Sequence, residues 1–586
     1  MHPHRTGKWV TSRSVESDIR ARRDYQGGQV GSTSSPGANP SAVKWWGWGL
    51  ESKTYPLDDK PQFWPYLLET LKLAKLNECS RVTIEEVRLP PRRLDDRTLA
   101  RLKRAVGADV SSEKYDRLTH SLGKSYLDLL NLRRGLIRNP PDAVVYPKDE
   151  RDVAKLLSFA RTNRISIVPF AGGSSVVGGV EPIKLRGRKG AVTVDLRRMK
   201  SVLDVDAFSL TATVEVGISG PELEDELNKR GFTLGHFPQS FQFSVLGGWI
   251  ATRSAGQVST KYGKIEDMVE SLTLVSPTGK LDTKAVPASA SGPQLKQVLI
   301  GSEGTLGVIT KAKLRIHRVP AVRRYEGLMF KSFRDGINAI RETMQSGLNP
   351  AMMRLSDPDE TTVSLMLSSQ SATTKLGLWM LERLGYVPSR ECVMILGVEG
   401  DPTAVKAERQ VAVRACKRNG AFAIGKGVGA TWLNERFELP YLRDVLLDHC
   451  ILVDTLETAT TWDKLEALHG AMKKSIEEAI AEMGVAGLAF AHVSHAYPDG
   501  ASIYYTLVAP QVNGKEVQQW LRIKKAATDC IMQNGGTLSH HHGIGKDHTP
   551  WIKQELGENG LALLRAMKKQ LDPEGIMNPG KLLVSS

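Results

Sequence analysis

The sequence has few cysteines and no long apolar run. Its 586 residues include five cysteines, which lie far apart and never form a Cys-x-x-Cys pair. This spacing suggests neither a disulfide framework nor a zinc site, and it favours a reducing compartment. No apolar stretch is long enough to cross a membrane. We find no secretory, transit or peroxisomal signal, so we expect a cytoplasmic protein, or a peroxisomal one with an unreadable signal if the source is eukaryotic.

Acidic residues are fewer than basic ones, which leaves a formal net charge of +15 at pH 7. Such a charge suits nucleic acid, an anionic membrane surface or phosphorylated substrates. The sequence lacks zinc-finger spacing, an aromatic RNA-binding signature and a long basic block, so we expect no nucleic-acid partner. The apolar fraction of 41% and the charged fraction of 24% are typical of a soluble globular protein, and the length predicts two or three domains.

Composition and periodicity divide the chain into three parts. Residues 1–42 are polar and rich in Gly, Ser and Pro, and we expect a disordered arm. Residues 43–137 begin with Trp45, Trp46 and Trp48, which we interpret as buried anchors, and continue with helical spacing from 63 to 76 and from 126 to 136. From residue 138 a strand, a helix and a second strand follow one another, which predicts the start of an α/β domain, the first of the two or three that the length predicts.

The first of these domains has clear local signals. Apolar alternation predicts strands over 140–147, 165–170, 191–196, 210–216 and 269–275. Residues 152–163 have helical spacing. A second helix is predicted over 219–229, because Ser219 and Glu222 form a Ser-x-x-Glu capping box.

Three segments rich in small residues follow strands of this domain and together predict one extended ligand site. Glycines after a strand let the backbone approach a ligand, and successive N–H groups can bind the pyrophosphate of a dinucleotide. The segments fit neither a phosphate-binding P-loop nor the Rossmann fingerprint. The candidate cofactor-binding residues are Ala171, Gly172, Gly173, Ser174, Ser175, Val176, Val177, Gln239, Ser240, Phe241, Gln242, Phe243, Ser244, Val245, Thr252, Arg253, Ser254, Ala255, Glu303, Gly304, Thr305, Leu306, Gly307, Val308 and Ile309.

These segments, with the ending 572–581, resemble the FAD-binding domain of the vanillyl-alcohol oxidase superfamily. The resemblance implies an α+β fold, with a PCMH-type FAD-binding domain over 138–320, an α+β cap domain for the substrate over 321–560 and a C-terminal return, 561–586, to the FAD-binding domain. In this superfamily FAD lies extended, with its pyrophosphate on the first loop. No histidine or cysteine lies between Val168 and Val180, so we expect FAD to be bound noncovalently.

Within the superfamily the chain resembles more closely the alkyldihydroxyacetonephosphate synthase family. The motifs that carry this likeness are 46–49 (WGWG), 353–355 (MRL), 441–444 (YLRD), 502–505 (SIYY) and 538–543 (LSHHHG). The resemblance implies that Tyr504 is catalytic and needs activation by a neighbouring charge, since a free phenol is protonated at neutral pH. It places His540, His541 and His542 in the active site and gives Arg443 the role of binding the substrate phosphate. Arg354 is a second substrate-binding candidate that could orient the histidines.

Each of these residues also has an ordinary structural interpretation. Tyr504 could be a packed cross-strand partner, Arg443 could pair with Asp444 on a helix surface, and Arg354 could be structural. The histidine run follows a predicted strand at 536–538, where neighbouring side chains alternate between faces. Three adjacent histidines then cannot all bind one metal ion, and we expect no metal.

By resemblance the reaction exchanges the acyl chain of 1-acyl-dihydroxyacetone phosphate for a long-chain fatty alcohol, through a covalent bond to flavin N5 and without net redox change. We also expect a homodimer and peripheral membrane contact, with amphipathic candidates at 63–76 and 365–384. Two alternatives remain open. One is an FAD-dependent 2-hydroxy-acid dehydrogenase or oxidase, and the other is a flavin-containing lipid-binding or scaffold protein without turnover.

Overall fold

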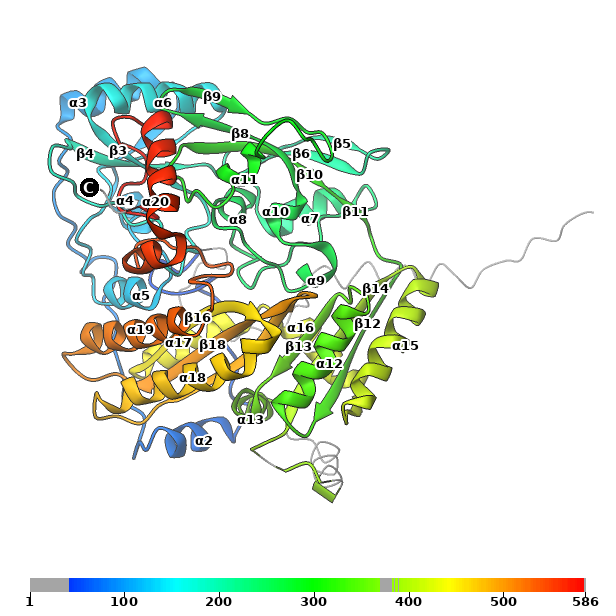
Figure 1. Ribbon diagram of the computed structural model, residues 1–586. Coiled ribbons are helices and arrows are strands. Elements are labelled where there is room, and N and C mark those ends of the chain that lie inside the picture. Colours follow the sequence, from blue (N-terminus) through cyan, green and yellow to red (C-terminus); the bar gives the residue numbers. More distant parts are fainter. Residues whose placement is uncertain (1–41, 369–381, 384, 388, 584–586) are drawn as a thin grey trace, which may run out of the picture.

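Two domains are stacked on each other, and the chain crosses between them several times (Figure 1). The computed structural model describes residues 42–368, 382–383, 385–387 and 389–583. The predicted arm, 1–42, lies outside these residues apart from Ala42. The predicted α+β class is confirmed, with parallel strand pairs in the first domain and an antiparallel sheet in the second.

The first domain holds two sheets whose apolar faces share one core. The four-stranded sheet has the order β1-β2-β4-β3, in which β4 runs parallel to both β2 and β3. The five-stranded sheet has the order β5-β6-β10-β8-β9 and is antiparallel. The strands are β1 (Asp109–Ser111), β2 (Ala143–Tyr146), β3 (Ile165–Phe170), β4 (Gly190–Asp195), β5 (Val202–Asp206), β6 (Thr211–Glu215), β8 (Val269–Ser276), β9 (Gly279–Asp282) and β10 (Val308–Arg315), and a separate pair joins β7 (Phe232–Thr233) to β11 (His317–Arg318).

Local sequence signals predict this domain well. The predicted strands appear as β2, β3, β4, β6 and β8, and the helix predicted at 152–163 is α6 (Glu150–Asn163). The capping box is also present, because the Glu222 carboxylate accepts hydrogen bonds from both the N–H and the hydroxyl of Ser219, at the start of α7 (Gly220–Asn228). The domain's remaining helices are short: α8 (Leu246–Thr252), α9 (Ser259–Tyr262), α10 (Ile265–Met268) and α11 (Leu295–Leu299).

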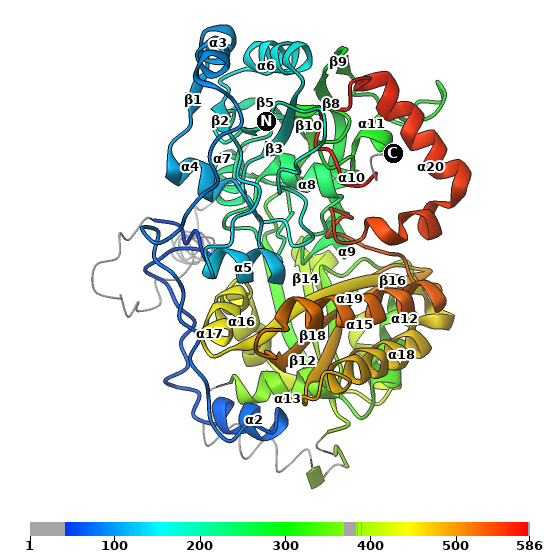
Figure 2. The same cartoon turned by 90° about the vertical axis from the view of Figure 1, so that its left-hand side faces the viewer.

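The second domain is a seven-stranded antiparallel sheet with the order β15-β12-β14-β13-β17-β18-β16. Its strands are β12 (Val322–Phe330), β13 (Met352–Ser356), β14 (Cys392–Gly400), β15 (Phe422–Gly425), β16 (Ile451–Thr461), β17 (Leu488–Ala496) and β18 (Gly500–Pro510). One face is covered by α12 (Phe333–Gln345), α15 (Pro402–Arg418), α18 (Trp462–Ala481) and α19 (Glu516–Gln533) (Figures 1 and 2). The other face turns toward the first domain, flanked by α13 (Pro358–Met366), α16 (Lys426–Glu435) and α17 (Leu439–Asp448).

The N-terminal region, 43–137, contributes to several cores. It contains α2 (Phe63–Thr70), α3 (Asp96–Val106), α4 (Lys114–Thr119) and α5 (Tyr126–Arg133). Helix α3 packs in the core of the first domain and α5 in that of the second, while α2 packs on α17 through Phe63 and Leu67. The apolar face of α2 is therefore covered by protein. Trp45 and Trp48 are buried as predicted, whereas Trp46 is half-buried, with Arg81 over its ring.

The C-terminal segment returns to the first domain, where α20 (Ile552–Leu571) lies along its side (Figure 2). Beyond the helix the chain runs beside β3, and Ile167 exchanges backbone hydrogen bonds of 2.8 Å with Ile576 and Asn578.

One expectation about cysteine is wrong. Cys79 and Cys450 form a disulfide with a Cα–Cα distance of 5.3 Å, although 371 residues separate them in sequence. The N-terminal region brings them together as it crosses the second domain, where the N–H of Cys79 donates to the carbonyl of Asp448 at 2.7 Å. Among the described residues, no helix is both long and apolar enough to span a membrane.

Candidate active site

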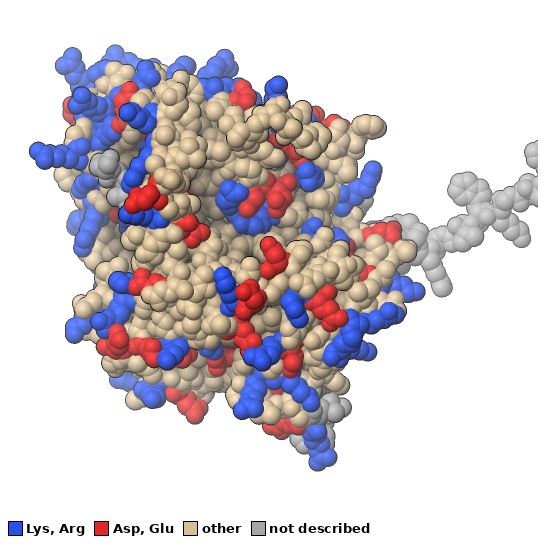
Figure 3. Space-filling model, viewed as in Figure 1, with Lys and Arg blue, Asp and Glu red and all other residues tan. Residues whose placement is uncertain are grey.

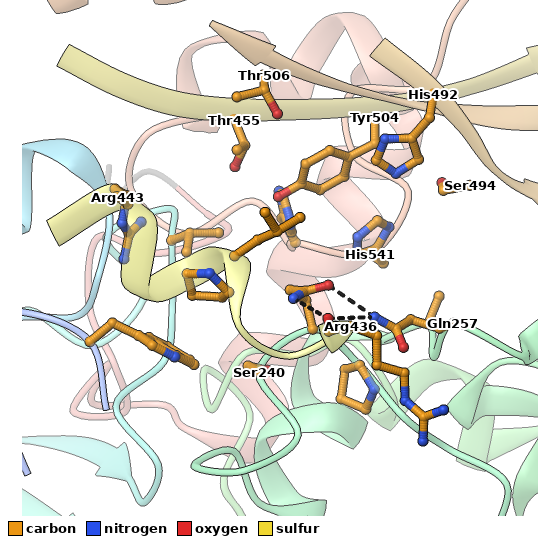
Figure 4. Close-up of a pocket in the computed structure, with 18 of the residues that line it drawn as sticks. Ser240, Gln257, Arg436, Arg443, Thr455, His492, Ser494, Tyr504, Thr506 and His541 are labelled. Carbon is orange, nitrogen blue, oxygen red and sulfur yellow. Dashed lines mark hydrogen bonds between the residues drawn. The ribbon is translucent and has the colours of Figure 1, made fainter. Parts of the chain in front are cut away.

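A cavity of about 1310 Å³ lies between the two domains. Its walls come from the small-residue segments of the first domain, the inner face of the second-domain sheet and the N-terminal region. Tyr504, Arg443, Arg354, His541 and His542 all line it, and Figure 4 shows the first two and His541 around one space. The structure therefore brings together five of the six predicted catalytic and substrate-binding side chains.

Tyr504 stands at the centre of a row that crosses three neighbouring strands. It pairs with Glu457 of β16 on one side and with His492 of β17 on the other. Directly opposed residues project to the same face of a sheet, so all three point toward the cavity side. The ring of Tyr504 is stacked on His492, with centroids 5.2 Å apart, and faces His541 at 6.1 Å. Glu457 and His492 were not predicted, because no local motif reveals which strands pair.

Burial raises the pKa of Tyr504 to about 12, although the hydroxyl of Thr455 and the charge of Arg443 act in the opposite direction. The activating charge expected from the sequence is thus present in Arg443, but in the protein without substrate or FAD the effect of burial on the pKa of Tyr504 is larger. The phenol is therefore protonated at neutral pH. Tyr504 is also the cross-strand partner that the structural interpretation foresaw, with its hydroxyl end open to the cavity (Figure 4).

Arg443 is a half-buried cation with an unused hydrogen-bond donor. Its Nη1 donates to the carbonyl of Lys124 at 2.9 Å, while Nε has no hydrogen-bond partner in the described part of the chain. Burial lowers the pKa of the guanidinium. The neighbouring Asp444 accepts from Lys44 Nζ at 3.1 Å and from the N–H of Trp48 at 2.8 Å. A half-buried guanidinium with an unused donor is suited to a phosphate.

The charge of Arg354 is already paired. Its Nη2 lies 2.8 Å from Glu360 Oε1 and 3.0 Å from His492 Nδ1. Burial would raise the pKa of Glu360, but Arg354 and His492 outweigh it and lower the value to about 2. Arg354 therefore orients a histidine, as one interpretation proposed, but this histidine is His492 and not a member of the 540–542 run.

The histidine run is a turn and not a continuation of a strand, which corrects the expectation for 536–538. The described chain forms only bends and turns from Gly535 to Asp547. His541 and His542 line the cavity, whereas the Nε2 of His540 lies 2.6 Å from the Tyr497 hydroxyl. The carboxylate of Glu303 accepts from the N–H groups of Ile544 and Gly545, both at 2.7 Å.

A fifth histidine, His495, joins the site from β17. A β-bulge between Val493 and His495 lets both His492 and His495 face the cavity side. Ring nitrogens of His495, His540 and His541 lie within 4.8 Å of one another, a spacing that could hold a metal ion. Hydrogen bonds within the chain already engage all three rings. We therefore assign no metal ion to them.

Most predicted cofactor-binding residues line the cavity, and eight do not. Those on the wall are Ala171, Gly172, Gly173, Ser174, Ser175, Val176, Gln239, Ser240, Ser244, Val245, Thr252, Ser254, Ala255, Glu303, Gly304, Gly307 and Ile309. Those away from it are Val177, Phe241, Gln242, Phe243, Arg253, Thr305, Leu306 and Val308. The eight residues away from the wall follow or alternate with wall residues in sequence, so their side chains point elsewhere. For example, Arg253 Nη2 lies 2.9 Å from Gln297, and Val177 is buried beneath the loop.

Comparison with known proteins agrees with this architecture. Residues 141–283 match the model of the FAD binding domain, and residues 319–582 match that of the C-terminal domain of FAD linked oxidases. The alkyldihydroxyacetonephosphate synthase of Dictyostelium discoideum is 37% identical over 515 residues, which are 87% of this chain and 84% of that protein. The chain belongs to the alkyldihydroxyacetonephosphate synthase family.

Two further comparisons support membership of this family. The synthase of Trypanosoma brucei brucei is 36% identical over 570 residues, 93% of this chain and 92% of that protein. A solved structure of an alkyldihydroxyacetonephosphate synthase superposes with a TM-score of 0.79 at 33% identity and covers 92% of this chain and 98% of that one. As a member of the family, the protein is an FAD-dependent enzyme.

The loop after β3 fits the pyrophosphate of FAD. The backbone N–H groups from Gly172 to Val176 have no acceptor among the residues that the structure describes. Gly173 has a φ of +61°, and a Cβ on Gly172 would lie 2.4 Å from the carbonyl oxygen of Phe243. These two glycines keep the loop close to its neighbour while its donors stay free, which is the arrangement of an anion-binding nest.

Proposed function

We propose that the protein exchanges the acyl chain of 1-acyl-dihydroxyacetone phosphate for a long-chain fatty alcohol. The products are 1-alkyl-dihydroxyacetone phosphate and a fatty acid. The observation that carries this proposal is that Arg443, a half-buried cation with an unused donor, lines the same cavity as Tyr504. The relatives named alkyldihydroxyacetonephosphate synthase support the same reaction.

The cavity offers different surroundings to the two ends of such a substrate. Its polar end holds Arg443, Tyr504 and the histidines. Elsewhere the wall is apolar, with side chains from α2, α13, α17 and β18 that include Phe63, Leu67, Leu365, Leu446 and Val508. Burying alkyl chains against such a surface is favourable by about 0.8 kcal/mol for each methylene group. The apolar wall therefore suits both the acyl chain that leaves and the alkyl chain that replaces it.

In the proposed reaction Tyr504 exchanges a proton with the carbon that bears the ester. Arg443 would hold the phosphate, and its charge would offset part of the burial that keeps the phenol protonated. Bound FAD supplies an electrophilic flavin, so the exchange needs no net electron transfer. We propose that FAD is held noncovalently, and flavin that stays on the denatured chain would contradict this.

The direct test is incorporation of a labelled long-chain alcohol into acyl-dihydroxyacetone phosphate by the purified yellow protein. We expect Tyr504→Phe to abolish incorporation while it leaves FAD binding intact. Tyr505→Phe is the matched control, because Tyr505 is fully buried on the opposite face of the same strand. Absence of incorporation by the wild-type protein with both substrates present would reject the proposal.

The same preparation tests the alternatives. Bleaching of the flavin by lactate or glycolate would favour a 2-hydroxy-acid dehydrogenase. Bound lipid without either reaction would favour a scaffold protein.

We also propose peripheral membrane contact and a homodimer, in the cytoplasm or in a peroxisome. The net charge of +15 supports contact with anionic lipid. In Figure 3 basic side chains are spread over both domains on the face shown. On α2 the apolar side is buried, so we expect any contact through this helix to depend on charge. Residues 369–381 and 384 of the other candidate segment, 365–384, lie outside the described residues. Vesicle co-sedimentation at low and high salt tests the contact, and failure at both would exclude it.

A further inference from the structure

Glu457 is a buried carboxylate at the centre of the site, and the proposed mechanism leaves it without a role. It lies in the middle of β16 opposite Tyr504, and only 3% of its surface is exposed. Burying a charged carboxylate is costly unless it is paired and hydrogen-bonded. The contacts of Glu457 therefore indicate what it does.

The carboxylate of Glu457 organises the histidine turn. It accepts hydrogen bonds from the backbone N–H groups of three consecutive residues: His540, His541 at 3.1 Å and His542 at 2.8 Å. The hydroxyl of Ser539 donates to it at 2.7 Å. Three N–H groups converging on one oxygen pair form a nest around an anion, so the turn has this shape because the carboxylate is there.

The same carboxylate lies beside two of the imidazole rings. Its oxygens are 3.8 Å from His541 Nδ1 and 3.7 Å from His542 Nδ1. Burial would raise the pKa of Glu457, but the three histidines and Ser539 hold it well below its usual range. Glu457 therefore stays ionised wherever the protein is folded near neutral pH.

Other charged groups face the rings from several elements. Burial lowers the pKa of His541 and His542, and Glu457 is the main opposing influence on both. The pKa of His541 is also lowered by the neighbouring ring of His542, by His495 of β17 and by Lys264 near α10. Lys524 of α19 lowers that of His542, and Asp454 of β16 raises it. The negative charge that most favours a proton on these rings is therefore that of Glu457.

We propose that Glu457 is a positioning residue that fixes the histidine turn and sets the proton affinity of His541 and His542. The inference rests on the proposed function, in which these rings meet the substrate's phosphate or its departing carboxylate. Either role uses the protonated imidazole, and the charge of Glu457 increases the fraction of these rings that carries a proton at a given pH. Glu457 does not itself touch the substrate, because the turn lies between it and the cavity.

The test removes the negative charge of Glu457 while it keeps the size and shape of the side chain. Glu457→Gln retains one oxygen acceptor for the turn but loses the negative charge. An opposite charge at this distance shifts a pKa by about 1–3 units. We therefore expect the apparent pKa above which the rate declines, as the imidazole loses its proton, to fall by at least one unit. Incorporation of alcohol should then fall at least tenfold at pH 7.5 and by less at pH 6.

Two further variants separate charge from structure. Glu457→Asp keeps the charge, so its pH profile should stay close to that of the wild type even if the rate falls. Glu399→Gln is the matched control, because Glu399 is a buried carboxylate of the same sheet that accepts from the hydroxyls of Tyr262 and Tyr325, away from the turn. The pH–rate profile of Glu399→Gln should match that of the wild type. An equal loss for Glu457→Gln at every pH, with an unchanged profile, would overturn the inference.

A second measurement does not depend on turnover. Histidine labelled with ¹⁵N reports the pKa of each ring by NMR, and single substitutions of His541 and His542 assign the two signals. We expect at least one of the two values to fall by one unit or more in Glu457→Gln and neither to change in Glu399→Gln. Unchanged values in a folded Glu457→Gln protein would refute the inference even if the substrates were different. If the wild-type protein incorporates no alcohol, this result by itself would instead refute the proposed function.

Discussion

Substitution of Gly172 by alanine should weaken FAD binding because two loops meet there. A Cβ at this position would lie 2.4 Å from the carbonyl oxygen of Phe243 and 2.9 Å from the Cα of Ser244. Ordinary contacts begin near 3.4 Å, so the loops would have to separate by about 1 Å. Both neighbours are backbone atoms and cannot rotate away. Overpacking of this kind costs about 1–3 kcal/mol, and both loops contribute to the cavity wall.

If this cost falls on the FAD-bound form, the affinity for FAD should drop by roughly 5- to 150-fold. The assay is titration of the apoprotein with FAD, followed by quenching of flavin fluorescence. Gly470→Ala is the matched control, since a Cβ on Gly470 in α18 meets no atom within 4 Å. An affinity of Gly172→Ala within twofold of the wild type, at an unchanged melting temperature, would show that the contact between these loops does not shape the FAD site.

Two predictions concern stability. Reduction of the bond between Cys79 and Cys450, or serine at either position, should lower the free energy of unfolding by about 2–4 kcal/mol. Unfolding in denaturant measures this free energy. Equal stability of the oxidised and reduced protein would mean that the bond does not form. Burial raises the pKa of Glu303 to about 7, so its contribution to stability is complete below the unfolded value near 4.5 and is lost as the pH rises through 7. The melting temperature should therefore fall more steeply between pH 5 and 8 for the wild type than for Glu303→Gln. The extra loss in the free energy of unfolding should be at most about 3 kcal/mol. Parallel plots of melting temperature against pH for the two proteins would contradict this.

The features that the sequence predicts correctly depend on neighbouring residues. Strand β3 follows from apolar residues beside a glycine-rich loop, and α7 from the four-residue capping box at Ser219. The small-residue segments likewise predict one extended site, and most of their residues line a single cavity. Resemblance to a family adds Tyr504 and Arg443, which the structure places in the same cavity.

The features that the sequence does not predict depend on distant residues. Cys79 meets Cys450 only because the N-terminal region crosses the second domain. Glu457 lies 82 residues before Ser539, its hydrogen-bond partner, and no spacing rule connects them. Glu303 looks like part of a loop for the cofactor, yet its carboxylate anchors the turn after the histidines. Contacts of this kind follow from the fold as a whole.

The chemistry of the site therefore depends on strand register as much as on residue identity. Tyr504, Glu457 and His492 meet because β16, β18 and β17 pair in one alignment. A slip of one residue in β18 would turn Tyr504 to the other face and bring Tyr505 into the cavity. The alignment is stabilised on the opposite face of the sheet, where Tyr505 packs with other buried side chains under α18 and α19. Large-to-small substitutions in that core should thus alter the reaction without touching the cavity, because the core determines which face of β18 reaches the substrate. Tyr505→Phe keeps the ring and removes only a hydroxyl that has no hydrogen-bond partner among the described residues, so it should leave the alignment intact.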